Sequence, residues 1–345
     1  MITMNPTKHL CTRVLPVYIS SILISCVSLP DAPSLANTQA SYDKHTAQFI
    51  AENPHTQHSI KRPDGFQIQA REFNVERKGK GPSYVLMHGF PDNQHLYDLL
   101  IPSLAKTHHV VSFDFLGWGQ SDKPVTHNYK VSSQRVDLDA VVKALELKDL
   151  VIVVHDLSGQ VGIDWALNNE AKTSELVLLN SYYSPMPTLK APDAIEFYSR
   201  SGVLPDLARW GANKSEARFK DGLANQLYYF MSNPAARQQF IPVFAHSAAA
   251  IRPAFFSSVS VLWQELDNRA QEVGRMRMFA KPVRVIFGSD DPFLNEGVAR
   301  SFSEIFKNNC LQLVPKANHY VQLDNPQAVA SAMQSTFKAT GQCVQ

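Results

Sequence analysis

Charged residues and cysteines are scarce in this sequence. Of its 345 residues only 19% are charged and four are cysteines, whereas 44% are hydrophobic. So low a content of charge excludes a disordered chain and predicts a globular protein with one large core. One domain with a sizeable insertion fits this length.

Recognisable metal and nucleic-acid signals are also missing. The sequence has no H-E-x-x-H and no paired C-x-x-C, so we expect neither a metal nor another cofactor. The formal net charge is only +2. Loss of residues 1–25, which include Lys8 and Arg13 but no acid, would leave 31 basic and 31 acidic residues, so no nucleic-acid partner is expected.

The first residues follow the pattern of an export signal. Lys8 and Arg13 precede an apolar run over 14–29, which is followed by a stretch of small residues. The run is shorter than the roughly 20 residues needed to cross a bilayer, and Pro16 interrupts it. We therefore predict an exported protein, either periplasmic or secreted.

Two processing routes remain open. Cleavage after Ala36 would make residues 1–36 a signal peptide. Alternatively, Leu23-Ile24-Ser25-Cys26 resembles a bacterial lipobox, in which residues 1–25 are removed and Cys26 carries a lipid anchor. The mature chain would then keep Cys310 and Cys343, which an oxidising compartment allows either to pair or to remain free thiols.

The pattern of apolar residues divides the rest of the chain. Residues 37–61 are polar and without periodicity, and we interpret them as a linker. Short buried strands alternate with amphipathic helices over 62–182 and again over 282–345, which predicts one mostly parallel sheet flanked by helices. The residues between, 183–281, lack this alternation and are interpreted as an inserted helical cap.

Four loops at the carboxyl ends of predicted strands carry chemistry-bearing residues. They are the place where an open parallel sheet positions reactive groups. The sequence places His, Asp, Ser or Gly in each of them: 88–92, 155–160, 288–292 and 317–320.

The second of these loops has the character of a nucleophile elbow, a strained turn between strand and helix. Centring the turn on Asp156 puts the small residues Ser158 and Gly159 after the nucleophile, whereas centring it on Ser158 puts Asp156 and Gln160 on either side. The tighter turn favours Asp156. Asp156 could instead be a helix N-cap, a frequent role for aspartate.

Several ordered motifs over residues 65–337 resemble the α/β-hydrolase superfamily, in particular its epoxide hydrolases and haloalkane dehalogenases. They are His88-Gly89-Phe90-Pro91, residues 114–122, His155-Asp156, residues 288–291 and His319. The resemblance implies that Asp156 is the nucleophile, His319 the base and Asp291 its orienting acid, with Asp290 as second choice. It also implies oxyanion donors from the backbone of Phe90 and Leu157.

A carboxylate nucleophile suits attack on a saturated carbon. With an ordinary pKa of about 3.9 it is already ionised, so His319 is free to activate water against the resulting ester. Epoxide hydrolases protonate the leaving oxygen with cap tyrosines. The cap and its entry offer Tyr182, Tyr183, Tyr198, Tyr228 and Tyr229, of which we choose Tyr198 and Tyr228. Haloalkane dehalogenases use N–H donors, and Leu157 supplies none from its side chain.

We therefore expect an epoxide hydrolase that acts on a small hydrophobic organic substrate with water, and a haloalkane dehalogenase as the alternative. Two further hypotheses stay open, because fold does not determine function. One is an esterase that uses Ser158. The other is a binding protein without catalytic activity.

Overall fold

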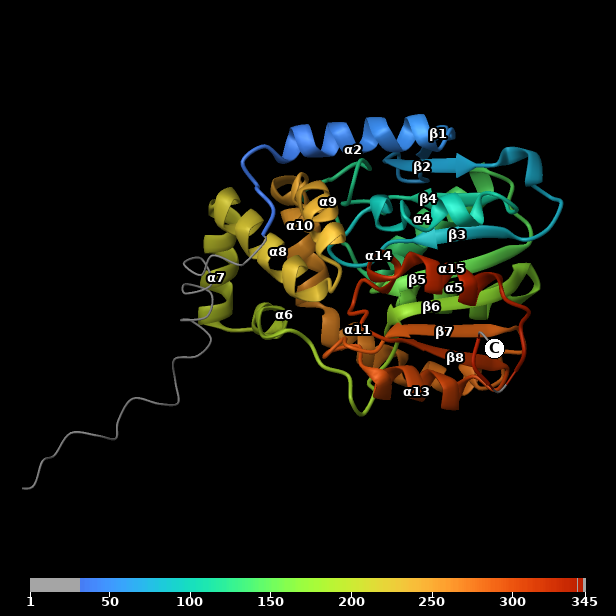
Figure 1. Ribbon diagram of the computed structural model, residues 1–345. Helices are drawn as coiled ribbons and strands as arrows, with labels where there is room; N and C mark the ends of the chain where they lie inside the picture. Colours follow the sequence, from blue (N-terminus) through green and yellow to red (C-terminus); the bar gives the residue numbers. More distant parts are fainter. Residues whose placement is uncertain (1–31, 340, 344–345) are drawn as a thin grey trace, which may run out of the picture.

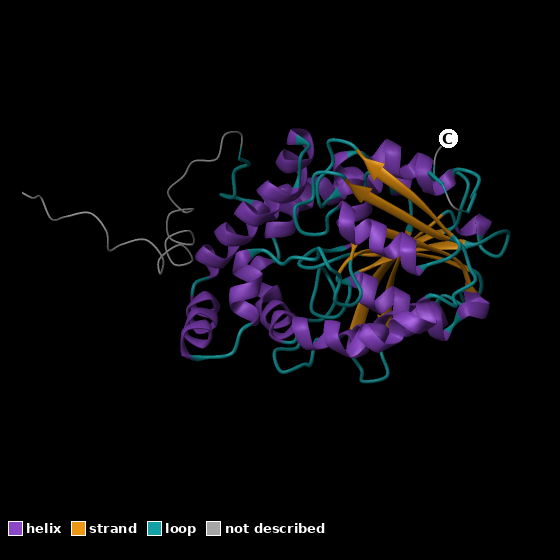
Figure 2. Ribbon diagram, turned by 90° about the horizontal axis from the view of Figure 1, so that it is seen from below, coloured by secondary structure: helices purple, strands orange, loops and turns teal. Residues whose placement is uncertain are grey.

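The computed structural model describes residues 32–339 and 341–343. Most of the predicted signal, including Cys26, lies outside the described residues. The described part is an eight-stranded sheet with helices on both faces and a group of helices at one end (Figures 1 and 2).

The sheet has the strand order β1-β2-β4-β3-β5-β6-β7-β8 and is parallel except for β2, which runs antiparallel to both β1 and β4. The predicted mostly parallel sheet is thus confirmed. The strands are β1 Thr56–Lys61, β2 Gln67–Phe73, β3 Ser83–Met87, β4 Val110–Phe113, β5 Leu150–Asp156, β6 Thr173–Ser181, β7 Val283–Gly288 and β8 Asn309–Val314.

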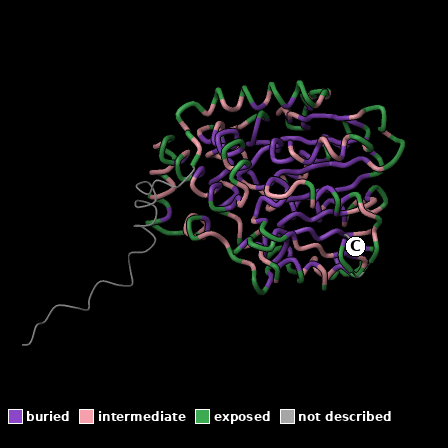
Figure 3. Tube along the Cα trace, in the orientation of Figure 1, coloured by how far each residue is buried: buried purple, intermediate pink, exposed green. Residues whose placement is uncertain are grey.

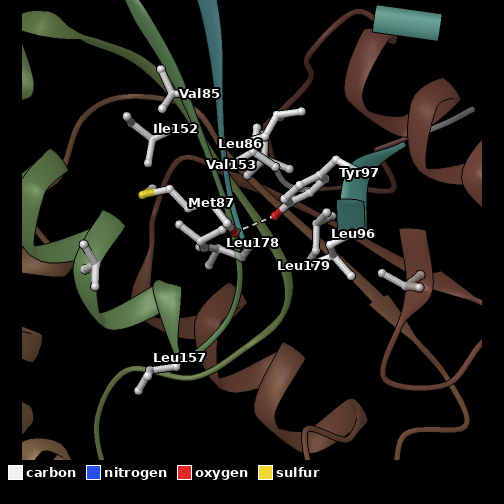
Figure 4. Close-up of a cluster of buried hydrophobic side chains, with 14 of the residues drawn as sticks. Val85, Leu86, Met87, Leu96, Tyr97, Ile152, Val153, Leu157, Leu178 and Leu179 are labelled. Atoms are coloured by element: carbon white, nitrogen blue, oxygen red, sulfur yellow. Dashed lines mark hydrogen bonds between the residues drawn. The ribbon is translucent and has the colours of Figure 1, made fainter. Parts of the chain in front are cut away.

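The central strands β3 and β5 are covered on both faces, which explains their continuous apolar sequences. Val85, Leu86, Ile152 and Val153 are completely buried, and Figure 4 shows them within one apolar cluster. The burial colouring of Figure 3 shows the same contrast between buried strands and exposed outer helices. Burial of this kind stabilises the sheet by roughly 1.5–3 kcal/mol for each large aliphatic side chain.

Short helices connect the strands and cover the sheet. The first helical segment after β3 is interrupted: a 3-10 turn at Gln94–Tyr97 is followed by α3, Ile101–Leu104. Pro102 lies in the first turn of α3, where a proline favours a new helix start. The other helices of the core are α4 Val131–Ala144, α5 Ser158–Asn168, α13 Glu296–Ile305, α14 Val321–Asp324 and α15 Pro326–Gln334.

The segment predicted as a linker is structured, which corrects that expectation. Helix α2 spans Thr38–Glu52, and β1 forms the edge of the sheet. Only His45 and Phe49 of α2 are buried. His45 Nε2 lies 2.8 Å from Asp98 Oδ2, so a polar contact holds the helix in place. Two buried positions are too few to produce a periodic apolar pattern, which is why the sequence did not reveal the helix.

The predicted helical insertion between β6 and β7 is confirmed. Figure 1 shows its helices beyond the end of the sheet at which the parallel strands finish. None of the described helices is both long enough and apolar enough to cross a membrane. The cap helices are α6 Asp193–Ser199, α7 Val203–Lys214, α8 Glu216–Phe230, α9 Pro234–Ala245, α10 Ala248–Ser260, α11 Leu262–Arg269 and α12 Val273–Met276.

Cys310 and Cys343 form a disulfide, which settles the open question of their pairing. Because the bond closes a loop with a sequence separation of 33 residues, we expect Cys343→Ser to lower the free energy of unfolding by about 4 kcal/mol. Urea unfolding of the oxidised protein would measure this loss. Reductant should lower the free energy of unfolding of the wild type by the same amount as the substitution does, and it should leave that of the variant unchanged. Two free thiols in unreduced protein would contradict the bond.

Candidate active site

Asp156 occupies the sharp turn between β5 and α5. Its φ of 51° lies in the left-handed region, which a side chain other than glycine adopts only when the surrounding structure enforces it. The strand ends at Asp156 and the helix begins at Ser158, so the carboxylate projects from the apex of the turn. This is the strained geometry of a nucleophile elbow.

Gly159 makes the turn possible. A Cβ atom at this position would lie 1.9 Å from Ser181 Oγ and 2.7 Å from the main-chain oxygen of Tyr182. In addition, the Ser181 hydroxyl donates a hydrogen bond of 2.8 Å to the main-chain oxygen of Asp156. The end of β6 therefore packs directly against the elbow.

Ser158 is not placed as a nucleophile. It is 1% exposed and lies outside the residues that line the cavity described below. Its Oγ is 2.8 Å from the main-chain oxygen of His155 and 3.0 Å from that of Met87, and it accepts a hydrogen bond of 2.9 Å from the backbone N–H of His155. The hydroxyl thus fastens the base of the elbow to β3.

His319 lies between two carboxylates from different loops. Its Nδ1 is 2.9 Å from Asp291 Oδ2, and its Nε2 is 3.7 Å from Asp156 Oδ2. The structure therefore brings together the three residues that the sequence selected for nucleophile, acid and base. Asp290, the second choice for the acid, is exposed and accepts a hydrogen bond from the neighbouring Ser289 hydroxyl.

Asp291 is held by several donors. Its Oδ1 accepts from the backbone N–H groups of Phe293 and Leu294 at 2.9 and 3.0 Å, and its Oδ2 accepts from Asn180 Nδ2 at 3.0 Å. Asn180 is a site residue that sequence reasoning missed, although it stands at the end of a strand that was predicted. These contacts and the His319 charge leave the pKa of Asp291 below its ordinary value, despite burial, which opposes this.

The two oxygens of Asp156 have different surroundings. Oδ1 accepts a hydrogen bond of 3.0 Å from the backbone N–H of Phe90, and the backbone N–H of Leu157 is a further donor to this carboxylate. Oδ2 faces His319. The two backbone groups expected to form an oxyanion hole therefore already contact the carboxylate, while one oxygen remains on the histidine side.

Burial and the neighbouring charges shift the pKa values of Asp156 and His319 in opposite directions. Burial raises the pKa of Asp156, and the charge of His319 only partly offsets this. Burial by itself would lower the pKa of His319, but Asp291 and then Asp156 raise it to about 9. His319 therefore carries a proton at neutral pH as long as Asp156 is ionised.

A buried polar network of Asp92, His155 and Tyr320 supports the loop that carries His319. The sequence did not predict this network. The Tyr320 hydroxyl donates a hydrogen bond of 2.8 Å to Asp92 Oδ1. His155 Nε2 lies 3.0 Å from the main-chain oxygen of His319, and His155 Nδ1 lies 3.7 Å from Asp92 Oδ2. His155 precedes Asp156 in sequence and Asp92 lies near it in space, so both help to position Asp156 and His319.

An apolar cavity opens over Asp156 and His319, between the sheet and the cap. Tyr182 and Gln226 are among its few polar side chains. Neither Tyr198 nor Tyr228 is among its lining residues: the Tyr198 ring packs edge-on against Phe256, and the Tyr228 ring stacks under Arg237. The apolar lining consists of Phe90, Leu157, Leu189, Ala191, Pro192, Ile195, Phe230, Val259, Leu262, Leu266, Phe293 and Leu294.

Within residues 32–339 and 341–343, one set of side chains has the spacing of metal ligands: His45, His95 and Asp98. Asp98 Oδ2 lies 2.8 and 2.6 Å from the two imidazoles, and Asp98 Oδ1 accepts from Arg71 at 2.8 Å. The carboxylate is thus neutralised by a guanidinium, and the set holds α2 against the core.

Comparison with known proteins agrees with this architecture. The family model for the alpha/beta hydrolase fold matches residues 82–326. The chain belongs to the α/β-hydrolase family. This makes it an enzyme of the α/β-hydrolase type, and the fold predicted from its sequence is confirmed.

Relatives of this α/β-hydrolase differ in their reactions. The cis-3-alkyl-4-alkyloxetan-2-one decarboxylase of Xanthomonas campestris pv. campestris is 25% identical over 282 residues, which are 77% of this chain and 91% of the relative. A bacterial membrane phospholipase A has a similar structure, with a TM-score of 0.66, 16% identity and coverage of 86% and 90%. The epoxide hydrolase CorEH has a TM-score of 0.62, 20% identity and coverage of 81% and 96%. Likenesses this distant show the fold alone.

The contact at Gly159 leads to a prediction with a matched control. Gly159→Ala should lower the free energy of unfolding by about 3 kcal/mol, since the new methyl group meets the end of β6. At Gly222, in α8, a methyl group would meet no atom within 4 Å, so Gly222→Ala should stabilise the protein by roughly 0.5–1 kcal/mol. Urea unfolding of both variants would compare them. Equal effects would mean that the elbow is not tightly packed.

Proposed function

We propose that this α/β-hydrolase attacks a saturated carbon through Asp156, forms an aspartyl ester and hydrolyses it, and that its substrate is an epoxide. The observation that carries the proposal is the arrangement around Asp156. One carboxylate oxygen is bound by backbone donors, the other faces the cavity histidine, and the neighbouring Ser158 hydroxyl is buried in main-chain contacts.

In the first step Asp156 Oδ2 attacks a ring carbon of the epoxide. The new bond joins this oxygen to the carbon, the ring C–O bond breaks, and the electron pair stays on the leaving oxygen as an alkoxide. The alkoxide then takes up a proton. Asp156 Oδ1 becomes the carbonyl oxygen of the ester, to which the N–H of Phe90 already donates, and the N–H of Leu157 is a further donor to the same carboxylate.

In the second step water attacks this ester carbonyl. Esterification removes the negative charge of Asp156, which is one of the groups that raises the pKa of His319. His319 then loses its proton more readily and becomes able to accept one from the attacking water. Negative charge develops on Oδ1, beside the backbone N–H of Phe90. The tetrahedral intermediate collapses, the alkyl oxygen takes the proton from His319, and a diol is released. Asp156 is left as the carboxylic acid and returns its proton to His319, which restores the starting ion pair.

Tyr182 is the residue we propose as proton donor to the alkoxide, in place of the predicted pair Tyr198 and Tyr228. It lines the cavity beside Asp156. Burial, and then the charge of Asp156, raise its pKa well above 10, so its hydroxyl stays protonated. An alkoxide is basic enough to take that proton, and the tyrosinate recovers a proton from solvent.

The two alternatives differ in the leaving group. A halide leaving group needs N–H donors, but the side chain of Leu157 has none. The indole N–H of Trp263 already donates a hydrogen bond of 2.9 Å to Ser199 Oγ. Haloalkane dehalogenation is therefore the second choice. The named relative that acts on an oxetan-2-one, which is also a strained oxygen ring, supports including β-lactones in any substrate screen.

The cavity wall and the disulfide also bear on the substrate and the location of the protein. We infer a small hydrophobic organic substrate, because the cavity wall is mainly aliphatic and aromatic. Export to the periplasm or beyond, with or without a lipid at Cys26, remains our proposal. The disulfide between Cys310 and Cys343 supports it, since such bonds persist in oxidising compartments.

The aspartyl ester should accumulate in a His319→Gln variant, since the second step then has no base. The variant would be exposed to a pool of epoxides, haloalkanes and β-lactones, and its intact mass would be measured. A gain equal to a whole epoxide, located on Asp156 by peptide mapping, is the expected result. A gain of an alkyl group minus one hydrogen would identify a dehalogenase, and a gain equal to a β-lactone would identify a lactone-opening enzyme.

Two controls accompany this experiment. The double variant His319→Gln/Asp156→Asn should form no adduct, whereas His319→Gln/Ser158→Ala should still form the adduct on Asp156, even though its elbow has lost the tie to β3. An adduct on Ser158, or a folded His319→Gln variant that stays unmodified by the whole pool, would defeat the carboxylate mechanism. Activated acyl esters would then be the substrates to test.

The role of Tyr182 is best measured on the first step alone. In the His319→Gln background, Tyr182→Phe should slow adduct formation with an epoxide by about 100-fold or more, the usual contribution of a general acid. Tyr198→Phe and Tyr228→Phe are the matched controls and should change this rate little. Because its pKa is raised, wild-type Tyr182 should sustain the rate up to at least pH 10. A slow Tyr198→Phe or Tyr228→Phe variant would restore the cap tyrosines as donors.

A further inference from the structure

Helix α7 of the cap turns its apolar side outward. Val203, Leu204, Leu207 and Trp210 are 82%, 58%, 54% and 60% exposed. Their spacing of one, three and three residues places them on one side of the helix, which we call the α7 face. A helix on a globular protein normally buries such a face, so this orientation requires an explanation.

The opposite side of α7 is anchored to the cap, which prevents the helix from turning over. Pro205 is buried, and Ala212 packs against the core. Arg209 Nη1 donates to the main-chain oxygen of Arg200 at 2.9 Å and also to that of Tyr198, while its Nη2 pairs with Asp206. The exposed side is therefore a stable feature of the fold.

The charge of the cap is suited to an anionic surface. Residues 183–281 contain 12 lysines and arginines and eight aspartates and glutamates, whereas the described remainder of the chain contains 19 and 22. Lys214 ends α7, and its Nζ lies 5.8 Å from the centre of the Trp210 ring. An indole beside a lysine at the edge of an apolar face is typical of helices that lie in a membrane interface.

The N-terminal part of the chain meets the cap at the same corner. The main-chain oxygen of Leu35 accepts a hydrogen bond of 3.4 Å from Lys220 Nζ, on the helix that follows α7. Figure 1 shows this end of the described chain beside α8. The apolar run over 14–29 is only a few residues away in sequence. From Cys26 to Ala32 the chain can span at most about 20 Å, so a lipid on Cys26 would keep this corner close to a bilayer.

We propose that the α7 face lies on a lipid surface that contains anionic headgroups, with Val203, Leu204, Leu207 and Trp210 among the acyl chains and Lys214 at headgroup level. The contact is peripheral, and α7 lies parallel to the surface. Helix α7 packs against α6, whose Ile195 lines the cavity, so the lipid-bound face adjoins one wall of the site. This inference does not depend on the proposed reaction.

Trp210 provides a direct test. The full chain would be mixed with vesicles of brominated phosphatidylcholine and phosphatidylglycerol, because bromine quenches only tryptophans within the acyl region. Trp118 and Trp165 are buried, so the signal comes from Trp210 and Trp263. Quenching should be strong in the wild type and in Trp263→Phe, and it should be lost in Trp210→Phe.

A matched pair of variants tests the face as a whole. Leu207→Asp should weaken vesicle binding at least about tenfold, as loss of one buried leucine implies. Val75→Asp, at a position 45% exposed and outside the cap, should bind as the wild type does. Absence of Trp210 quenching in vesicle-bound protein would overturn the proposal. So would a dimer that Leu207→Asp dissociates, because a second copy would then cover the face. These readouts measure lipid contact, so they are independent of whether the epoxide chemistry is correct.

Discussion

The left-handed backbone of Asp156 is the constraint on which the site depends. It is accommodated only because β6 can approach the start of α5 at Gly159, and because Ser158 fastens the turn to β3. A strained turn supported from two sides holds the carboxylate at the apex. The neighbouring strands then bring the backbone of Phe90 and the His319 loop to fixed distances from it.

The second organising feature is one imidazole between two carboxylates. Asp291 is anchored by its loop and by Asn180, so it orients His319, whereas Asp156 has one oxygen on the cavity side. Only the charge of Asp156 changes if an ester forms. In the mechanism that we propose, ester formation both occupies Asp156 and removes one of the charges that raise the pKa of His319, which is the coupling that a two-step hydrolysis requires.

The cap contributes an apolar wall to the site and an apolar face to the exterior. Its inner residues exclude water from the carboxylate, which raises the pKa of Asp156 and strengthens every hydrogen bond around it. Its outer helix α7 turns its apolar side toward the exterior, whereas an ordinary surface helix buries that side. These two properties suit an enzyme that acts on hydrophobic molecules near a lipid surface, which is how we combine the proposals.

The sequence by itself determined the fold class, the strands from β2 onward and the three loops that carry Asp156, Asp291 and His319, because apolar alternation and the chain order of reactive residues are local patterns. It did not reveal α2, whose attachment rests on the polar contact of His45, nor the network of Asp92 and Tyr320. Only the tertiary structure paired Cys310 with Cys343, buried Ser158 and placed Tyr182, instead of Tyr198 or Tyr228, on the cavity wall. Such outcomes depend on how distant segments pack, and no local pattern records that.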